Sequence, residues 1–202
     1  MNAVVKESKS LLKLDIGCGP NPREGFTGVD SLNFGNEKIV KHDLRVTPWP
    51  FEDNSVSEVH SSHFLEHLTN LNEKWERVRF FNELHRVLVP VEYNNAGIPI
   101  AGFARITIPH WCSNRYYGDP THKEPMGEMF ICYLDPAWRK QNAPHTDKEH
   151  NPDGYDCHFA CTYDYTLHQG LAGRNSEYVQ MAVTFWKEAV QDLVIVASCI
   201  KK

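Results

Sequence analysis

The 202-residue sequence has no apolar run of the roughly 18 to 20 residues that a membrane-spanning helix needs. It also lacks an excess of basic residues, since 21 Lys and Arg stand against 26 Asp and Glu, for a formal net charge of -5. The field of the whole molecule therefore repels nucleic acid and anionic membranes. Residues 1–13 mix Lys6, Glu7 and Lys9 with short apolar stretches, unlike a signal peptide. These absences predict a cytoplasmic protein that does not act on membranes.

The six cysteines include no pair with the two-residue gap of a zinc knuckle or a redox pair. Five possible metal ligands gather within residues 145–161, but without a recognised ligand spacing. Residues 159–165 have a strand pattern, which would hold Cys157 and Cys161 roughly 13 Å apart, too far to share one ion. We therefore expect reduced, structural thiols and no metal site. The five residues are His145, His150, Cys157, His158 and Cys161.

Short apolar runs bounded by turn residues alternate with helical patterns along the chain. The apolar residues of 72–89 follow the spacing of three and four that marks one face of a helix, and Pro90 ends it. A second helical pattern covers residues 177–190. This alternation predicts an α/β protein with parallel connections. Strands are expected at residues 11–16, 26–30, 38–42, 57–61, 103–108, 159–165 and 193–200.

The chain length suits a single domain covering residues 1–202. Within residues 110–158 the periodic pattern dissolves into Pro, His, Tyr, Asp and Asn. A structureless segment of this length inside a compact domain is uncommon, so we expect short helices there, one of them within residues 125–139. The segment is predicted to be an inserted lid or acceptor-recognition region, with a variable surface excursion as the alternative.

A glycine-rich turn follows the first predicted strand, and an acidic residue ends the second. The turn carries Gly17 and Gly19, and the acidic residue is Asp30. Glycines allow a ligand to pack against bare backbone, and a carboxylate at the tip of the neighbouring strand can accept hydrogen bonds from two ribose hydroxyls. The pattern therefore predicts a nucleoside-binding crevice beyond the carboxyl ends of the parallel strands.

The same turn argues against a dinucleotide. A dinucleotide site needs a third glycine three residues after Gly19 and a helix whose N-terminus receives the pyrophosphate. Position 22 is Pro, and residues 17–25 leave room for about one helical turn. Acidic residues such as Asp15 and Asp30 would repel a pyrophosphate and tolerate a cation. S-adenosylmethionine, with its sulfonium, is the predicted cofactor, and a nicotinamide cofactor is the weaker alternative.

Four segments, in order, resemble the motifs of the class I, seven-stranded S-adenosylmethionine-dependent methyltransferases, in particular the small-molecule methylases. LDIGCGPNPREGFTGVD is similar to their first motif, and KHDL to the loop after the third strand. WPFEDNSVSEVHSSHFLEHL is similar to the segment around the fourth strand, and FFNELHRVLVP to the helix leading into the fifth. The resemblance covers residues 11–109. It implies a Rossmann-like, mostly parallel seven-stranded sheet, here with trimmed first helices and a long insertion after the fifth strand.

The resemblance also implies a role for individual residues. S-adenosylmethionine would lie along the carboxyl ends of the first three strands, and S-adenosylhomocysteine would be the product. The cofactor-binding residues implied are Asp15, Gly17 and Gly19 for the methionine part, Asp30 for the ribose, Asp43 and Leu44 for the adenine, and Ser61 beneath the sulfonium. Cys18, as a small filler of the turn and not a nucleophile, and Ser31 are further predicted cofactor-binding residues.

The chain departs from the family pattern in three places. The first helix of the family is nearly deleted, and the second is reduced to residues 32–37. The usual glycine pair after the long helix is replaced by VPVEYNNAGIPIAG. A scaffold trimmed in this way exposes part of the sheet, which a partner subunit could cover, so a homodimer is one expectation.

Two histidines are candidate general bases. His63 follows the fourth strand and His110 the fifth, and these strand tips flank the methyl group in this fold. A hydrogen-bonded structural histidine is the alternative for each. Glu66 and His67, at the start of the helical region, fit a structural cap as well as a catalytic role. A lid or acceptor pocket is expected from His122, Trp111, Tyr116 and Tyr117.

These features predict an enzyme that transfers a methyl group to an oxygen or nitrogen acceptor, preferably on a small molecule. The residues after the fourth strand, SSHF, lack the prolines of base aminomethylases and the Pro-Cys of cytosine-carbon methylases, so no DNA base is expected as substrate. RNA ribose and protein side chains stay open as acceptors. The alternative function is a non-catalytic cofactor-binding or assembly module with the same fold.

Overall fold

The computed structural model describes residues 10–72 and 74–201. The expectation about a signal peptide rests on Lys6, Glu7 and Lys9, which lie outside the described residues. No helix among the described residues has the length and apolar character needed to cross a membrane.

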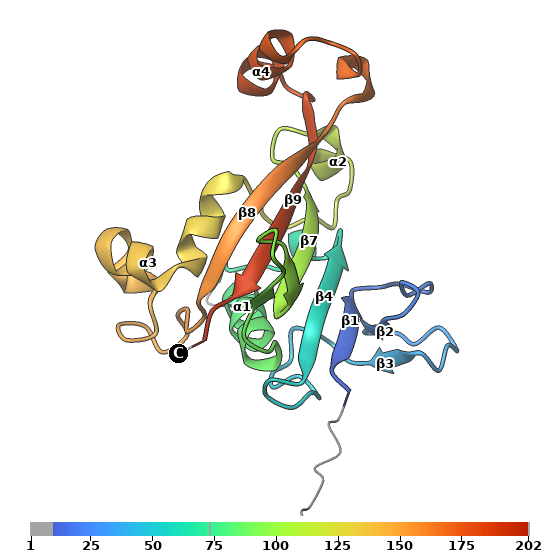
Figure 1. Ribbon diagram of the computed structural model, residues 1–202, viewed down its shortest axis with the longest axis vertical. Coiled ribbons are helices and arrows are strands. Elements are labelled where there is room, and N and C mark those ends of the chain that lie inside the picture. The colour runs from blue at the N-terminus through green and yellow to red at the C-terminus, as the bar shows by residue number, and fades with distance from the viewer. Residues whose placement is uncertain (1–9, 73, 202) are drawn as a thin grey trace, which may run out of the picture.

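One seven-stranded sheet runs through the molecule in the order β3-β2-β1-β4-β7-β9-β8 (Figure 1). The strands from β3 to β7 are parallel, and β9 runs antiparallel to both of its neighbours. The predicted α/β fold with a mostly parallel, seven-stranded sheet is confirmed. The strands are β1 (Leu12–Ile16), β2 (Thr27–Asp30), β3 (Ile39–Lys41), β4 (Val56–Ser62), β7 (Phe103–Pro109), β8 (Phe159–Leu167) and β9 (Val190–Cys199).

The two longest helices are shorter than the sequence pattern predicts. The long helix begins at Glu76 and not at residue 72, because Trp75 has a left-handed backbone with a φ of 48°. The C-terminal helix ends at Phe185, since Val190 already starts β9. The helices are α1 (Glu76–Val87), α2 (Asn114–Tyr117), α3 (Pro136–Asn142) and α4 (Ser176–Phe185), with 3₁₀ turns η1 (Leu65–His67), η2 (Glu128–Leu134), η3 (Pro144–Thr146) and η4 (Gln169–Leu171).

The connections between the first three strands contain no helix in the described residues. The predicted trimming of the first helix is confirmed, but the short helix expected at residues 32–37 is wrong. Asn33 and Asn36 there accept hydrogen bonds from the backbone N–H groups two residues further on, which closes tight turns in place of a helix. A hairpin of β5 (Glu92–Tyr93) and β6 (Pro99–Ala101), not predicted from the sequence, occupies the segment that replaces the glycine pair.

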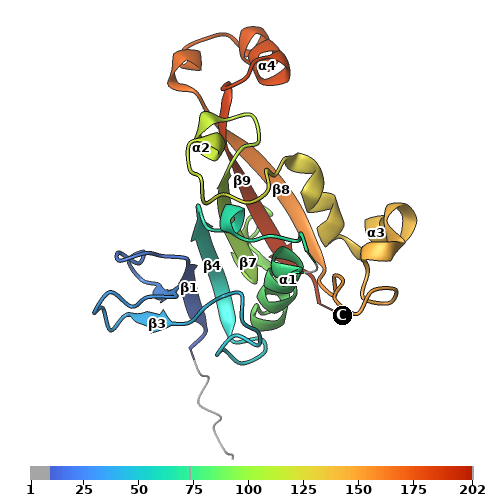
Figure 2. The same cartoon turned by 180° about the vertical axis from the view of Figure 1, so that it is seen from behind.

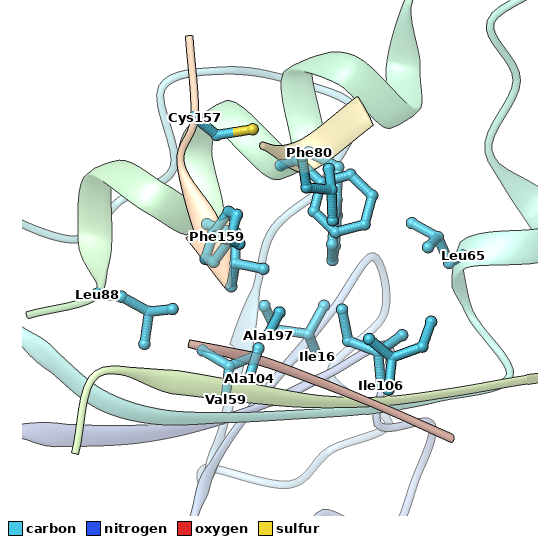
Figure 3. Packing of buried hydrophobic residues seen from close by; sticks show 14 of the residues in the cluster. Ile16, Val59, Leu65, Phe80, Leu88, Ala104, Ile106, Cys157, Phe159 and Ala197 are labelled. Atoms are coloured by element: carbon cyan, nitrogen blue, oxygen red, sulfur yellow. The ribbon is translucent and has the colours of Figure 1, made fainter. Parts of the chain in front are cut away.

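The main core lies between the sheet and α1. Figure 2 shows α1 across the face seen from behind, and Figure 3 shows the packed side chains. Phe80 of α1 is fully buried among Ile16, Val59 and Ile106 of three neighbouring strands. Burial of a side chain of this size stabilises the fold by about 1.5–3 kcal/mol. Leu65 of η1 joins the same core, so the loop after β4 is anchored next to the strand ends.

The opposite face of the sheet carries polar side chains and, in Figure 1, no covering helix among the described residues. Lys13 and Glu58 form an ion pair across β1 and β4 at 2.8 Å. His60 and Arg105 are neighbours on β4 and β7. A sheet face with polar side chains can face water without a covering layer. The homodimer, expected to cover an exposed part of the sheet, therefore stays a prediction.

His85 ties α1 to the last strand and gives the protein a predicted pH dependence. Its Nε2 donates a hydrogen bond to the carbonyl oxygen of Ile200 at 2.9 Å, and burial lowers the pKa of its imidazole below the usual 6.5. The unfolded chain then binds this proton more readily, so the free energy of unfolding falls as the pH drops through about 6.5. We expect urea unfolding to show a smaller loss of stability between about pH 7.5 and about pH 5.5 in His85→Gln than in the wild type. Equal losses would contradict the assignment.

Candidate functional site

A hollow of about 210 Å³ opens at the carboxyl ends of β1, β2 and β3. Its wall combines these strand ends with the loop after β4, which carries η1. The structure therefore brings together five of the nine predicted cofactor residues, from three different strand ends. They are Gly17, Asp30, Ser31, Asp43 and Leu44.

Gly17 is the point where the glycine turn and the loop after β4 touch. It has a φ of 66°, and a β-carbon added there would lie 2.6 Å from the ring of Phe64. The backbone N–H of Gly17 donates to the carbonyl oxygen of Val29 at 2.9 Å, which holds the turn against β2. Only glycine fits this position, because both the left-handed backbone and the contact exclude a side chain.

The close approach at Gly17 predicts a large loss of stability on substitution. Gly17→Ala should lower the free energy of unfolding by about 2–4 kcal/mol, from left-handed strain and overpacking against Phe64. Gly35→Ala is the matched control, since Gly35 has a φ of 75° but open space around it. In the same denaturant titration Gly35→Ala should lower the free energy of unfolding only by the left-handed strain, about 1–2 kcal/mol. Equal losses in the two variants would show that Phe64 does not press on Gly17.

Asp30 links the glycine turn to the strand that follows it. Its Oδ2 accepts a hydrogen bond from the N–H of Gly19 at 3.0 Å, and its Oδ1 accepts from the N–H of Leu32 at 3.2 Å. The Ser31 hydroxyl also donates to Oδ1, at 3.3 Å. A carboxylate has about four acceptor positions, so about one remains for a ligand in the hollow while Ser31 keeps this contact. Asp30 thus shapes the turn and presents acceptor oxygens at the wall.

Asp43 and Arg45 place opposite charges side by side at the end of β3. The Arg45 guanidinium donates to both carboxylate oxygens of Asp43, each at 2.9 Å. This pairing holds the pKa of Asp43 below its usual range. Arg45 was not predicted, although it follows the predicted adenine-binding pair directly. The hollow is therefore less acidic than the sequence pattern suggests.

Four predicted cofactor residues do not line the hollow. Asp15 is almost fully buried, and its carboxylate accepts from the N–H of Arg23 at 2.8 Å and lies 2.9 Å from His60 Nδ1. Asp15 therefore fixes the turn from behind. Gly19 contributes to the site indirectly, because its backbone N–H donates a hydrogen bond to Asp30.

Cys18 and Ser61 are the other two predicted cofactor residues that do not line the hollow. The Cys18 sulfur packs at Gly28, and burial together with Asp15 and Asp30 raises the pKa of its thiol to about 11. A thiol of this pKa stays protonated at neutral pH, as expected for a filler and not for a nucleophile. Ser61 is fully buried at the end of β4, and its hydroxyl has no hydrogen-bond partner in the described part of the chain.

Beside the hollow, the loop after β4 gathers histidines and carboxylates. His63 has a φ of 53° and a side chain 45% exposed. Its Nδ1 lies 3.3 Å from Oε1 of Glu66, and its Nε2 lies 3.8 Å from Oδ1 of Asp192 on β9. The Glu66 carboxylate raises the pKa of His63, because it stabilises the imidazolium. Asp192 is held in turn by an ion pair with Arg115.

His110, the second candidate base, lies in a different environment. It is 4% exposed, and both of its ring nitrogens are engaged. Nδ1 lies 2.9 Å from the sulfur of Cys112, and Nε2 lies 3.0 Å from Oε1 of Glu128, which also accepts from the Tyr165 hydroxyl at 2.6 Å. The structure therefore does not bring His63 and His110 together in one pocket.

The expected aromatic acceptor pocket divides into two groups. Tyr116 is buried, with its ring 5.3 Å from that of His122, and this pair packs beside η1. Trp111 and Tyr117 are exposed and line a separate hollow of about 380 Å³ with His110 and residues 183–187. Residues of the cofactor hollow that were not predicted to bind the cofactor lie in the segments after β3 and β4. They are His42, Arg45, Phe64, His67 and Leu68.

Comparison with known proteins gives a fold and no closer relative. No family model matches the sequence, and no curated protein matches it either. A SAM-dependent methyltransferase from Archaeoglobus fulgidus superposes with a TM-score of 0.57 at 18% identity, over 94% of this chain and 87% of that one. One from Methanosarcina mazei gives 0.53 at 14% identity, over 96% and 94%. A small RNA methyltransferase gives 0.50 at 10% identity, over 98% of this chain and 24% of that one. The chain therefore has the fold of the S-adenosylmethionine-dependent methyltransferases.

Proposed function

We propose that the protein transfers a methyl group from S-adenosylmethionine to an oxygen or nitrogen acceptor. The observation that carries the proposal is the hollow at the carboxyl ends of the first three strands, lined by Gly17, Asp30 and Asp43. Ligands of open α/β sheets bind at this edge. S-adenosylmethionine, when bound, supplies the activated methyl group on its sulfonium, so the protein has to hold the cofactor and align the acceptor.

Each wall of the hollow suits one part of the cofactor. Asp30 presents acceptor oxygens to the ribose hydroxyls, with Ser31 beside it. Asp43 and Leu44 offer a carboxylate and an apolar side chain to the adenine. Gly17 lines the hollow with the ring of Phe64 packed against its backbone, and this wall is the one proposed for the methionine part.

The remaining predicted cofactor residues support this seat from behind. Asp15 and Gly19 fix the turn through their hydrogen bonds, and Cys18 fills the space at Gly28. Ser61 is the residue proposed to lie under the sulfonium, and its buried hydroxyl has no hydrogen-bond partner in the described part of the chain.

His63 is the proposed general base for an acceptor that must lose a proton. It follows β4, its ring is half exposed, and two carboxylates stabilise the imidazolium that forms when it takes the proton. His110 has both ring nitrogens engaged, so we propose that it positions Glu128 and the chain after β7.

The insertion at residues 110–158 is the proposed acceptor-recognition region. It places His122 against η1, where the rings of His67 and His122 lie 4.9 Å apart. It also exposes Trp111 and Tyr117 on the neighbouring hollow, where flat faces suit a planar or cationic group. The net charge of -5 favours a small molecule over nucleic acid.

Calorimetry on the full chain with S-adenosylmethionine and S-adenosylhomocysteine tests the proposal. Binding followed by transfer of labelled methyl groups to a pool of small O and N acceptors is the expected result. Absence of heat at high ligand concentration would remove the proposal. Binding without transfer to any acceptor would favour the non-catalytic module, which the missing helices between the first strands also suit.

A further inference from the structure

Three side chains with metal-ligand chemistry converge where η1 meets the insertion. One potential ligand atom from each of Glu66, His67 and His122 lies within 4.8 Å of the other two. Figures 1 and 2 show the insertion passing the carboxyl end of β4, where η1 follows. We propose that these three residues bind one divalent first-row transition-metal ion. An ion bonded at about 2.1 Å to each would draw the ligand atoms to about 3.4 Å, within reach of small side-chain rotations.

The carboxylate of Glu66 gives independent support, because it is buried without a hydrogen-bond partner. Its side chain is 1% exposed, and neither oxygen has a hydrogen-bond partner in the described part of the chain. Burial of an unsatisfied carboxylate is strongly unfavourable. His63 Nδ1 at 3.3 Å and His122 Nε2 at 3.9 Å are the nitrogens near Oε1, and each offsets its charge only when the imidazole is protonated. A cation at this point would satisfy the carboxylate.

Hydrogen bonds fix both histidines in the tautomer that has a proton on Nδ1 and a lone pair on Nε2. His122 Nδ1 lies 2.7 Å from the carbonyl oxygen of Tyr116, which can only accept, so this nitrogen carries the proton. Thr121 gives its hydroxyl proton to Asp119 at 2.7 Å and therefore accepts from His67 Nδ1 at 3.1 Å. Metal-binding histidines are oriented by hydrogen bonds of this kind on the other ring nitrogen.

The ligand set indicates the class of metal. Two imidazoles and one carboxylate, with positions left open, suit zinc, iron(II), manganese or cobalt better than calcium or magnesium, which favour oxygen ligands. His67 also lines the cofactor hollow, so the ion would lie beside the methyl-transfer site. This last step rests on the proposed function. The acceptor oxygen would bind at an open position of the ion, which would lower the pKa of the acceptor.

The test measures metal binding directly on the full chain after treatment with a chelator. Titration with Co²⁺ should give one equivalent bound, with the visible absorption bands of a nitrogen- and oxygen-ligated ion. Zn²⁺ should compete for the same site in calorimetry. His122→Ala and Glu66→Gln should each weaken Co²⁺ binding by more than about tenfold, whereas His145→Ala, an exposed histidine elsewhere, should bind as the wild type does.

The outcomes separate this site from the proposed function. Wild-type protein that binds no stoichiometric Co²⁺, or His122→Ala with wild-type affinity and spectrum, would overturn the metal site. Circular dichroism and S-adenosylhomocysteine binding by His122→Ala establish that the variant is folded. If His122→Ala does not fold, His122→Gln replaces it, provided that its circular dichroism spectrum matches that of the wild type. Co²⁺ binding without S-adenosylhomocysteine binding would leave the metal site standing and remove the methyltransferase proposal, and the reverse result would do the opposite.

Discussion

Asp30→Ala is expected to weaken the binding of S-adenosylhomocysteine by about 5- to 150-fold, which corresponds to roughly 1–3 kcal/mol. The carboxylate lines the hollow at the end of β2, where it can accept hydrogen bonds from the ribose. It also accepts the N–H of Gly19 at 3.0 Å. Its removal therefore takes away ligand contacts and releases the glycine turn at the same time. Isothermal calorimetry on the wild type and the variant measures the effect.

Two variants accompany this measurement. Asp30→Asn keeps one acceptor oxygen in place and should lose less affinity than Asp30→Ala. Asp153→Ala removes an exposed carboxylate in the turn before β8 and should leave the affinity unchanged. Thermal unfolding of all three proteins separates a loss of binding from a loss of structure. An Asp30→Ala protein with wild-type affinity would show that the cofactor's sugar does not lie at the end of β2.

The strands could be predicted from the sequence because each is a short apolar run that ends at a turn residue or a charged residue. In β1 the apolar residues Leu12, Leu14 and Ile16 alternate with charged residues, and residues 193–197 of β9 form a continuous apolar run. The helices were harder to predict. Because Trp75 has a left-handed backbone, α1 begins four residues later than predicted. The turns built by Asn33 and Asn36 replace the helix expected after β2. Both effects depend on local hydrogen bonds and packing that compete with helical spacing.

The candidate site was predicted where strand order alone determines it. Asp30 and Asp43 meet because the carboxyl ends of parallel strands share one edge. The cluster beside the hollow was missed, because it joins residues from distant parts of the chain. His122 reaches Glu66 only through the path of the insertion, and Glu66 at the start of a helical segment fits a cap in the sequence. The burial of its carboxylate without a hydrogen bond is visible only in three dimensions.

His63→Gln is expected to lower kcat by about 10²- to 10⁴-fold for an acceptor that must lose a proton, while the affinity for S-adenosylhomocysteine stays the same. The imidazole is half exposed beside the cofactor hollow, and Glu66 and Asp192 stabilise its protonated form. Glutamine retains the polar contacts but cannot accept the proton. Single-turnover transfer of labelled methyl groups, with the acceptor found in the pool screen, measures the chemical step.

His110→Gln and His145→Gln distinguish a base from a structural histidine. His110 is buried between Cys112 and Glu128, so its replacement should lower the free energy of unfolding by about 1–3 kcal/mol, with a smaller change in kcat than at His63. His145 is exposed and should change neither quantity. A His63→Gln enzyme with the wild-type kcat, or a larger loss of kcat in His110→Gln, would show that the general base is not the histidine at the end of β4. In the first case the acceptor would need no side-chain base, as with a neutral amine, which loses its proton only after the new bond has formed.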